Sequence, residues 1–186
     1  MWYYHEARVG RDGSVPRDSL RWSQTFRKTH KRDQLGGTTP RGGSPRTCDL
    51  DLLLWDEGPT QNLERSEDCQ RLTVTVPQGT VDTAKRLEVI VWIHGGSFLT
   101  GSGEMPAYDA QTLASERNRI VVSLSYHVGL FGFMGDGKDR DANLGLFDLI
   151  EGLRWVQRNI AAFGGNPEPR RITVIGQSAR GSALAD

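Results

Sequence analysis

A short serine motif follows an apolar run near the end of the chain. Gly176-Gln177-Ser178-Ala179 comes directly after residues 171–175, which we expect to form a buried strand. A strand, a sharp turn and a helix would expose the Ser178 side chain as a nucleophile at the tip of the turn. The Ala179 N–H would then point toward a bound carbonyl oxygen. A helix N-cap is the alternative, because serine is favoured there and a lone Gly-x-Ser is frequent.

A second group follows another apolar run. His94-Gly95-Gly96-Ser97-Phe98 comes after residues 87–93. Adjacent glycines allow backbone N–H groups to converge on one point, which suits an oxyanion, and each such donor is worth about 3–4 kcal/mol. An ordinary glycine turn or a phosphate-binding loop is the alternative. The sequence has neither G-x-G-x-x-G nor G-x-x-x-x-G-K-[ST], which weakens the phosphate interpretation.

The elements around these motifs predict an α/β fold. Residues 87–93, 120–126 and 171–175 are apolar runs typical of strands buried on both faces, whereas residues 72–76 alternate as a half-buried strand does. Strands and helices that alternate in this way predict a mostly parallel sheet with flanking helices. Ligands of such sheets bind beyond the carboxyl ends of the strands, where both motifs stand.

Two helices are expected between the strands. Residues 110–117 suggest a short helix. Residues 144–163 carry apolar side chains at spacings of three and four, which predicts a long amphipathic helix. Asp141 or Asn143 can cap its start, and Gly164-Gly165 can end it.

Composition separates a basic arm from the rest of the chain. The first fifty residues contain ten Lys and Arg against five Asp and Glu, while the whole chain of 186 residues has a net charge of zero. Residues 1–47 are rich in Arg, Gly, Ser, Thr and Pro, so we expect a disordered or irregular arm there and a domain over residues 48–186. The arm lacks a nucleic-acid reading motif, so we expect no nucleic-acid partner.

Neither a membrane span nor a signal peptide is expected. No run of eighteen apolar residues occurs, and Met1 to Glu6 have neither a basic start nor an apolar stretch.

The two cysteines, Cys48 and Cys69, cannot build a zinc site, and no histidine stands near them at ligand spacing. They could form a disulfide that closes a loop of about twenty residues, worth about 3 kcal/mol, or remain free thiols. The spacing leaves both possibilities open.

Motif order and spacing over more than a hundred residues resemble the type-B carboxylesterase/lipase family, which includes the cholinesterases. The resemblance covers about residues 66–182. Its motifs are Ser66-Glu67-Asp68-Cys69 with Leu72-Thr73-Val74, Val91 to Phe98 with Gly101, Ser125 to Phe133, and Asn143 onward to Gly176-Gln177-Ser178-Ala179.

The resemblance implies the N-terminal part of an α/β-hydrolase fold that hydrolyses small carboxylic esters through an acyl-serine intermediate, without a metal or cofactor. It implies that Ser178 is the nucleophile and that Gly96, Ser97 and Ala179 supply the oxyanion N–H groups. Gly95 shapes the loop. Cys69 takes a family disulfide position, and Cys48 is its only possible partner. Family members are often secreted, but the sequence itself leaves the localisation open.

The sequence departs from the family pattern at three positions. Arg180 stands where the family has glycine, so its side chain must fit where strand and helix nearly touch. Ser97 replaces a third glycine, which matters less because its donor is the backbone. His127 occupies a position that the family gives to arginine.

The order of residues predicts an inactive chain. The family's triad runs from nucleophile to acid to histidine, yet only eight residues follow Ser178 and all four histidines precede it. We therefore expect no esterase turnover from this chain alone. A noncatalytic hydrolase-like binding or adhesion module is the alternative. We also expect non-specific self-association, because the strand at residues 172–175 would be left as an apolar edge.

Overall fold

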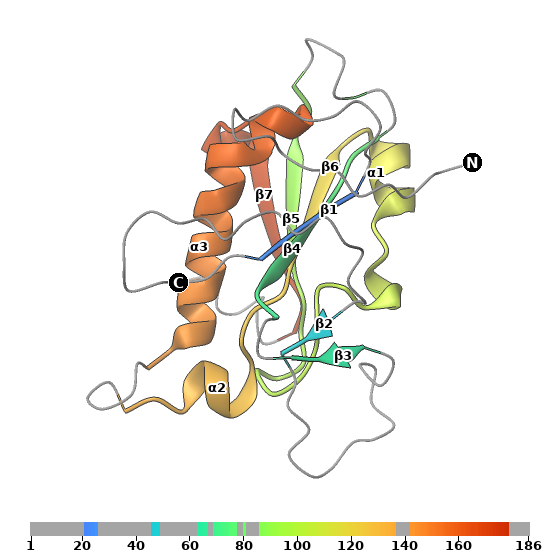
Figure 1. Cartoon of the computed structure of the whole chain (residues 1–186). Helices are drawn as coiled ribbons and strands as arrows, with labels where there is room; N and C mark the ends of the chain where they lie inside the picture. Colours follow the sequence, from blue (N-terminus) through green and yellow to red (C-terminus); the bar gives the residue numbers. More distant parts are fainter. Residues whose placement is uncertain are drawn as a thin grey trace.

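The computed structural model describes residues 21–25, 46–48, 63–66, 69–77, 80, 86–136 and 142–178. A five-stranded mixed sheet with the order β1-β4-β6-β5-β7 is the centre of the fold (Figure 1). Its strands are β1 (Arg21–Thr25), β4 (Arg71–Thr75), β6 (Ile120–Leu124), β5 (Val89–Ile93) and β7 (Ile172–Gly176). Two short strands, β2 (Arg46–Thr47) and β3 (Glu64–Arg65), form a separate parallel pair.

The parallel part of the sheet positions the two sequence motifs. β5 pairs in parallel with β6 on one side and with β7 on the other, so all three carboxyl ends lie at one edge. β4 is antiparallel to β6, and β1 is antiparallel to β4. The predicted class, a mostly parallel sheet with flanking helices, is confirmed.

Helices cover both faces of the sheet (Figure 1). The helical segments are η1 (Pro106–Tyr108), α1 (Gln111–Arg117), α2 (Gly129–Phe133), α3 (Leu144–Asn159), η2 (Ile160–Phe163) and η3 (Pro169–Arg171). α3 and η2 pack Leu149, Val156 and Phe163 into the main core, against one face of β5 and β6. α1 packs Ala110 and Ala114 with Ile90 and Val121 on the opposite face. Because helices cover both faces of β5 and β6, nearly every side chain of these two strands is apolar.

The predicted elements are found within a few residues of their expected positions. The expected helix over residues 144–163 is α3 continued by the 3₁₀ turn η2, and it ends at Gly164 with φ 81°. Asn143 occupies the N-cap position of α3. Its backbone is left-handed, with φ 58°, and its side chain makes no capping hydrogen bond. None of the helices in the described part of the chain is long and apolar enough to cross a membrane.

Two short segments of residues 1–47, where we predicted a disordered or irregular arm, form strands. Arg21–Thr25 forms β1, which pairs with β4, and Arg46–Thr47 forms β2. β1 has one aromatic residue and no apolar alternation, so its register comes from the β4 backbone rather than from its own pattern. The remainder of residues 1–47 lies outside the described residues, and the domain boundary at residue 48 stays a prediction.

β7 lies at the edge of the sheet, as expected from its place in the sequence. Its only neighbour among the described strands is β5, and Ile175 on this strand is 39% exposed. An exposed apolar edge favours pairing with other chains. Because of this edge, we continue to expect self-association of the chain.

A disulfide joins Cys48, next to β2, to Cys69, just before β4. Both cysteines are buried, and the Thr47 hydroxyl donates a hydrogen bond to the carbonyl oxygen of Gly101 at 3.1 Å. The bridge therefore anchors the β2 segment beneath the loop that follows β5.

Replacing both cysteines with alanine is expected to lower the free energy of unfolding by about 3 kcal/mol, because the bridge closes a loop of 21 residues in sequence separation. Urea denaturation of the two forms measures the difference. Intact mass after alkylation, with and without reduction, provides the control. Two alkylated thiols in the unreduced, folded protein would contradict the bridge.

Candidate active site

The two motifs meet at the carboxyl edge of the sheet. Ile93 is in register with Gly176, so the segment after β5 and the segment after β7 leave the sheet side by side. The Gln177 N–H donates a hydrogen bond to the Ile93 carbonyl oxygen at 3.1 Å, which continues the strand pairing by one residue. The sheet thereby fixes where Ser178 stands relative to the glycine loop.

Gly95 packs directly against the serine turn. A Cβ atom built on Gly95 would lie 3.3 Å from the Ser178 Cβ and 3.1 Å from the Gln177 carbonyl oxygen. Such distances are tighter than ordinary contacts, so any side chain at this position would push the loop and the turn apart. The absence of a side chain at Gly95 allows the close approach.

Ser178 has the strained backbone of a sharp turn. Its φ is 58°, in the left-handed region that residues with side chains rarely adopt, and the residue is exposed. Strain of this kind concentrates at functional sites and persists only where the surroundings enforce it. Here the enforcing contacts are the strand pairing of Gln177 and the packing of Gly95.

The glycine loop turns through three consecutive residues with positive φ, namely Gly96 at 115°, Ser97 at 53° and Phe98 at 64°. The Gly96 carbonyl oxygen accepts hydrogen bonds from the N–H groups of Leu99 and Thr100, at 2.9 and 3.1 Å. The N–H groups of Gly96 and Ser97 have no acceptor within the part of the chain that the structure describes. Successive free N–H groups in such a turn form a concave anion site.

The buried side chain of His94 supports the glycine loop. Its ring is buried and stacks on Tyr126, with 4.4 Å between ring centroids and 13° between planes. Nδ1 donates to the Gly95 carbonyl oxygen at 2.8 Å, and the Tyr126 hydroxyl donates to the His94 carbonyl oxygen at 2.9 Å. A Cβ on Gly101 would lie 2.5 Å from His94 Nδ1, so the imidazole also needs the glycine there.

Sequence reasoning missed Tyr108, which is hydrogen-bonded to Gln177, the residue before Ser178. Its hydroxyl donates a hydrogen bond to Gln177 Oε1 at 2.6 Å, and its ring lies 5.3 Å from that of Trp92. Burial raises the pKa of Tyr108 above its usual value of 10.0, so the hydroxyl remains a donor throughout the neutral range. No spacing in the sequence links a residue of η1 to a residue after β7.

The model of the carboxylesterase family matches residues 13–186. The chain belongs to the carboxylesterase family. This confirms the resemblance drawn from the motifs and extends it toward the N-terminus, because the motif match began only at about residue 66.

Individual relatives agree with the family assignment. The carboxylesterase chain is 43% identical to the para-nitrobenzyl esterase of Bacillus subtilis (strain 168) over 157 residues, which cover 82% of this chain and 30% of that protein. It is 46% identical to the cholinesterase of Mus musculus over 134 residues, 71% of this chain and 21% of the relative. The chain thus spans less than a third of the length of these curated relatives.

Solved structures share the same fold. A thermophilic PNB esterase matches with a TM-score of 0.64 and 41% identity, over 76% of this chain and 29% of its own. A second PNB esterase structure gives a TM-score of 0.65 at 38% identity, over 81% and 30% of the two chains. The sheet of this carboxylesterase chain is therefore part of an α/β-hydrolase fold.

His127 has a structural partner in the carboxylesterase chain. Its Nδ1 donates to Asp148 Oδ2 at 2.8 Å, and its backbone N–H donates to the same oxygen at 2.9 Å. Gln70 Nε2 donates to Asp148 Oδ1 at 2.9 Å. These hydrogen bonds connect the segment after β6 to the buried Asp148 on α3. His127 therefore has a structural role that sequence reasoning did not assign.

The remaining predicted site residue, Ala179, lies outside the described residues, as does Arg180. The structure brings Gly95 into contact with Ser178, and Gly96 and Ser97 follow Gly95 in the same loop. The roles of these residues and the effect of Arg180 stay predictions. No group of three His, Cys, Asp or Glu that could hold a metal ion occurs among the described residues.

Proposed function

We propose that this chain carries the nucleophile and the oxyanion hole of a carboxylic ester hydrolase that acts on small esters through an acyl-serine intermediate. The observation that supports this most directly is the contact between the glycine loop and the serine turn, with the built Gly95 Cβ only 3.3 Å from the Ser178 Cβ. Nucleophile and oxyanion donors must both lie about 3 Å from one reacting carbonyl. The contact supports such an arrangement, because it brings two motifs about eighty residues apart in the sequence to the same edge of the sheet.

In the proposed reaction, Ser178 Oγ attacks the ester carbonyl carbon while a base takes the hydroxyl proton. The carbonyl oxygen becomes an oxyanion held by the N–H groups of Gly96, Ser97 and Ala179. Collapse of the tetrahedral intermediate breaks the bond to the alcohol, which leaves with a proton. Water then hydrolyses the acyl-serine by the same steps.

The general base comes from outside the described residues. His94 donates its Nδ1 proton within the loop, His127 is bonded to Asp148, and neither is hydrogen-bonded to Ser178. A serine hydroxyl without a base is a weak nucleophile. We therefore expect the 186-residue chain alone to hydrolyse p-nitrophenyl butyrate no faster than its Ser178→Ala variant does.

A chimera tests the nucleophile separately from the base. This chain is joined to the part of the Bacillus subtilis para-nitrobenzyl esterase that follows the matched region. The chimera is expected to hydrolyse p-nitrophenyl butyrate and to react with a fluorophosphonate, the added mass mapping to the peptide that contains Ser178. The same chimera with Arg180→Gly tests whether the side chain at that position impairs the turn.

Two outcomes separate the possibilities. A rapid rate from the chain alone that Ser178→Ala abolishes would contradict the expected inactivity. A folded chimera that hydrolyses nothing and takes up no label, with Arg180 or with glycine there, would contradict the esterase proposal. That result would support the noncatalytic binding or adhesion module.

A further inference from the structure

A histidine and a buried carboxylate form a pair that the proposed ester chemistry at Ser178 does not use. His127 follows β6 at the carboxyl edge of the sheet, and Asp148 lies in the first half of α3. The side chain of Asp148 is 4% exposed, whereas that of His127 is 19% exposed. His127 Nδ1 donates to Asp148 Oδ2 at 2.8 Å. A buried acid therefore holds a histidine that solvent can reach.

The hydrogen bonds around Asp148 decide which ring nitrogen of His127 carries the proton. The Gln70 amide donates to Oδ1, and the His127 backbone N–H donates to Oδ2, each at 2.9 Å. The carboxylate is an acceptor in both contacts, so it also accepts from Nδ1–H. Gln70 Nε2 lies 2.9 Å from Nδ1 as well, but both of these nitrogens are donors. The neutral imidazole thus keeps its proton on Nδ1 and has its lone pair on Nε2.

The Nε2 atom is the accessible end of the ring. It makes no hydrogen bond with any residue that the structure describes. It is also not one of the buried nitrogens that lack a partner there, so solvent reaches it. The backbone of His127 is held tightly, because a Cβ on Gly132 or Gly145 would lie 2.3 or 2.4 Å from its carbonyl oxygen. The ring is fixed at one end and presents a lone pair at the other.

Exposed apolar side chains stand on α2 and α3, the two helices that pack on the His127 backbone (Figure 1). They are Leu130 and Phe131 of α2 and Leu146 in the first turn of α3. Covering apolar surface of this kind with an apolar molecule is favourable. The surroundings of His127 therefore favour a substrate with an apolar or aromatic part.

We propose that His127 is a second nucleophile of this chain, independent of Ser178, which takes the acyl group of apolar aryl esters onto Nε2. The Nε2 lone pair attacks the ester carbonyl carbon, the bond to the aryl oxygen breaks, and a phenolate leaves with the electron pair. An imidazole displaces a phenolate much more readily than an alkoxide, so alkyl esters are not substrates of this site. Asp148 stabilises the positively charged acylated ring until Nδ1 releases its proton to solvent.

Hydrolysis of the acylated ring completes the reaction. Water attacks the acyl carbon, the bond to Nε2 breaks, and the proton returns to Nδ1. Overall, one ester and one water give a carboxylate, a phenolate and two protons.

The test uses the full 186-residue chain with Ser178→Ala throughout, so no result depends on the proposed esterase nucleophile. This chain is expected to release p-nitrophenolate from p-nitrophenyl butyrate faster than buffer does. Diethyl pyrocarbonate leaves a stable acyl group on histidine, and mass spectrometry is expected to map it to His127. His94 is fully buried, so its labelling would report unfolding rather than reactivity.

His127→Arg separates a chemical role from a structural one. Arginine, which the family pattern has at this position, can still donate to Asp148 but carries no lone pair. The variant is expected to fold like the unchanged chain by circular dichroism and to lose the protein-dependent rate. His127→Gln, with a neutral donor, is the second variant should the arginine form fail to fold.

Two further substitutions test the carboxylate. Asp148→Asn removes the charge that orients the ring, and it is expected to slow both hydrolysis and labelling about tenfold. Glu151→Gln removes a solvent-accessible carboxylate further along α3 and is expected to change neither rate. Three results would overturn the proposal: a rate equal to that of buffer, a rate that the folded His127→Arg or His127→Gln chain retains, or labelling of other histidines without His127.

Discussion

We expect the kcat of ester hydrolysis by the chimera to fall by a factor on the order of 10⁴–10⁶ when Ser178 is replaced with alanine. Covalent catalysis depends wholly on the attacking oxygen, and the oxyanion donors that remain supply only residual acceleration. The Cβ of alanine occupies the same position beside Gly95 as that of serine, so the turn keeps its packing. Initial rates with p-nitrophenyl butyrate, together with the loss of fluorophosphonate labelling, measure the effect.

Ser97→Ala is the matched control for the loss of the hydroxyl. Both serines are exposed and have left-handed backbones, with φ values of 53° and 58°. The proposed role of Ser97 uses only its backbone N–H, so this variant is expected to retain kcat within about threefold. Comparable losses in the two variants would place the nucleophile elsewhere.

The second large effect is expected from Gly96→Ala. With φ at 115°, this position disfavours any side chain, and the added Cβ would stand 2.0 Å from the Thr100 carbonyl oxygen. The loop must open to relieve that overlap, which moves the N–H groups of Gly96 and Ser97 away from the reacting carbonyl. Displacing an oxyanion donor reduces kcat by about 10²–10³-fold. The kcat and KM of the chimera are measured separately, because the loss should fall mainly on kcat.

Gly129→Ala separates loop geometry from general strain. Gly129 also has a positive φ, at 61°, but an added Cβ there meets nothing closer than the Leu99 carbonyl oxygen at 3.5 Å. The substitution should lower stability by about 1–2 kcal/mol and leave kcat nearly unchanged. If both glycine variants lost kcat in proportion to their thermal stability, the loop would be acting only as part of the fold.

Local sequence patterns were enough to predict the central strands and the long helix, and to locate the motifs at the strand ends. Residues 89–93 and 120–124 are strands because continuous apolar runs between turn residues can be buried only in a sheet covered on both faces. Residues 172–176 also form a strand, but the expected burial on both faces is wrong for them, because this strand lies at the sheet edge and Ile175 is 39% exposed. The apolar side chains spaced three and four apart over residues 144–163 could be buried together only by a helix packed on that sheet. His94-Gly95-Gly96 predicted an oxyanion loop, since adjacent glycines at a strand end let N–H groups converge, and the order of the motifs favoured this over an ordinary turn.

Tertiary structure alone decided which distant residues meet. β1 was not predicted, because an edge strand takes its hydrogen bonds from its neighbour and needs no apolar pattern of its own. The bonds of Tyr108 to Gln177 and of His127 to Asp148 join residues 69 and 21 positions apart.

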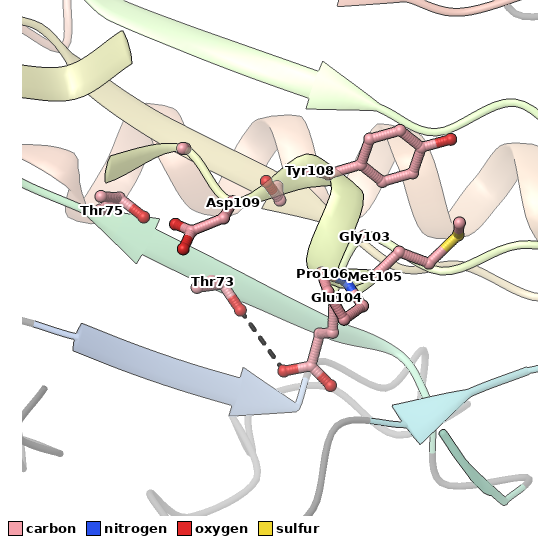
Figure 2. A pocket seen from close by; sticks show the side chains of 10 residues that line it. Thr73, Thr75, Gly103, Glu104, Met105, Pro106, Tyr108 and Asp109 are labelled. Atoms are coloured by element: carbon pink, nitrogen blue, oxygen red, sulfur yellow. Dashed lines mark hydrogen bonds between the residues drawn. The ribbon is translucent and has the colours of Figure 1, made fainter. Parts of the chain in front are cut away.

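Packing also places the segment before α1 beside Ser123 of β6, where the two line one cavity (Figure 2). A sequence determines the preferences of each segment, whereas strand order and register determine which side chains come within hydrogen-bonding distance.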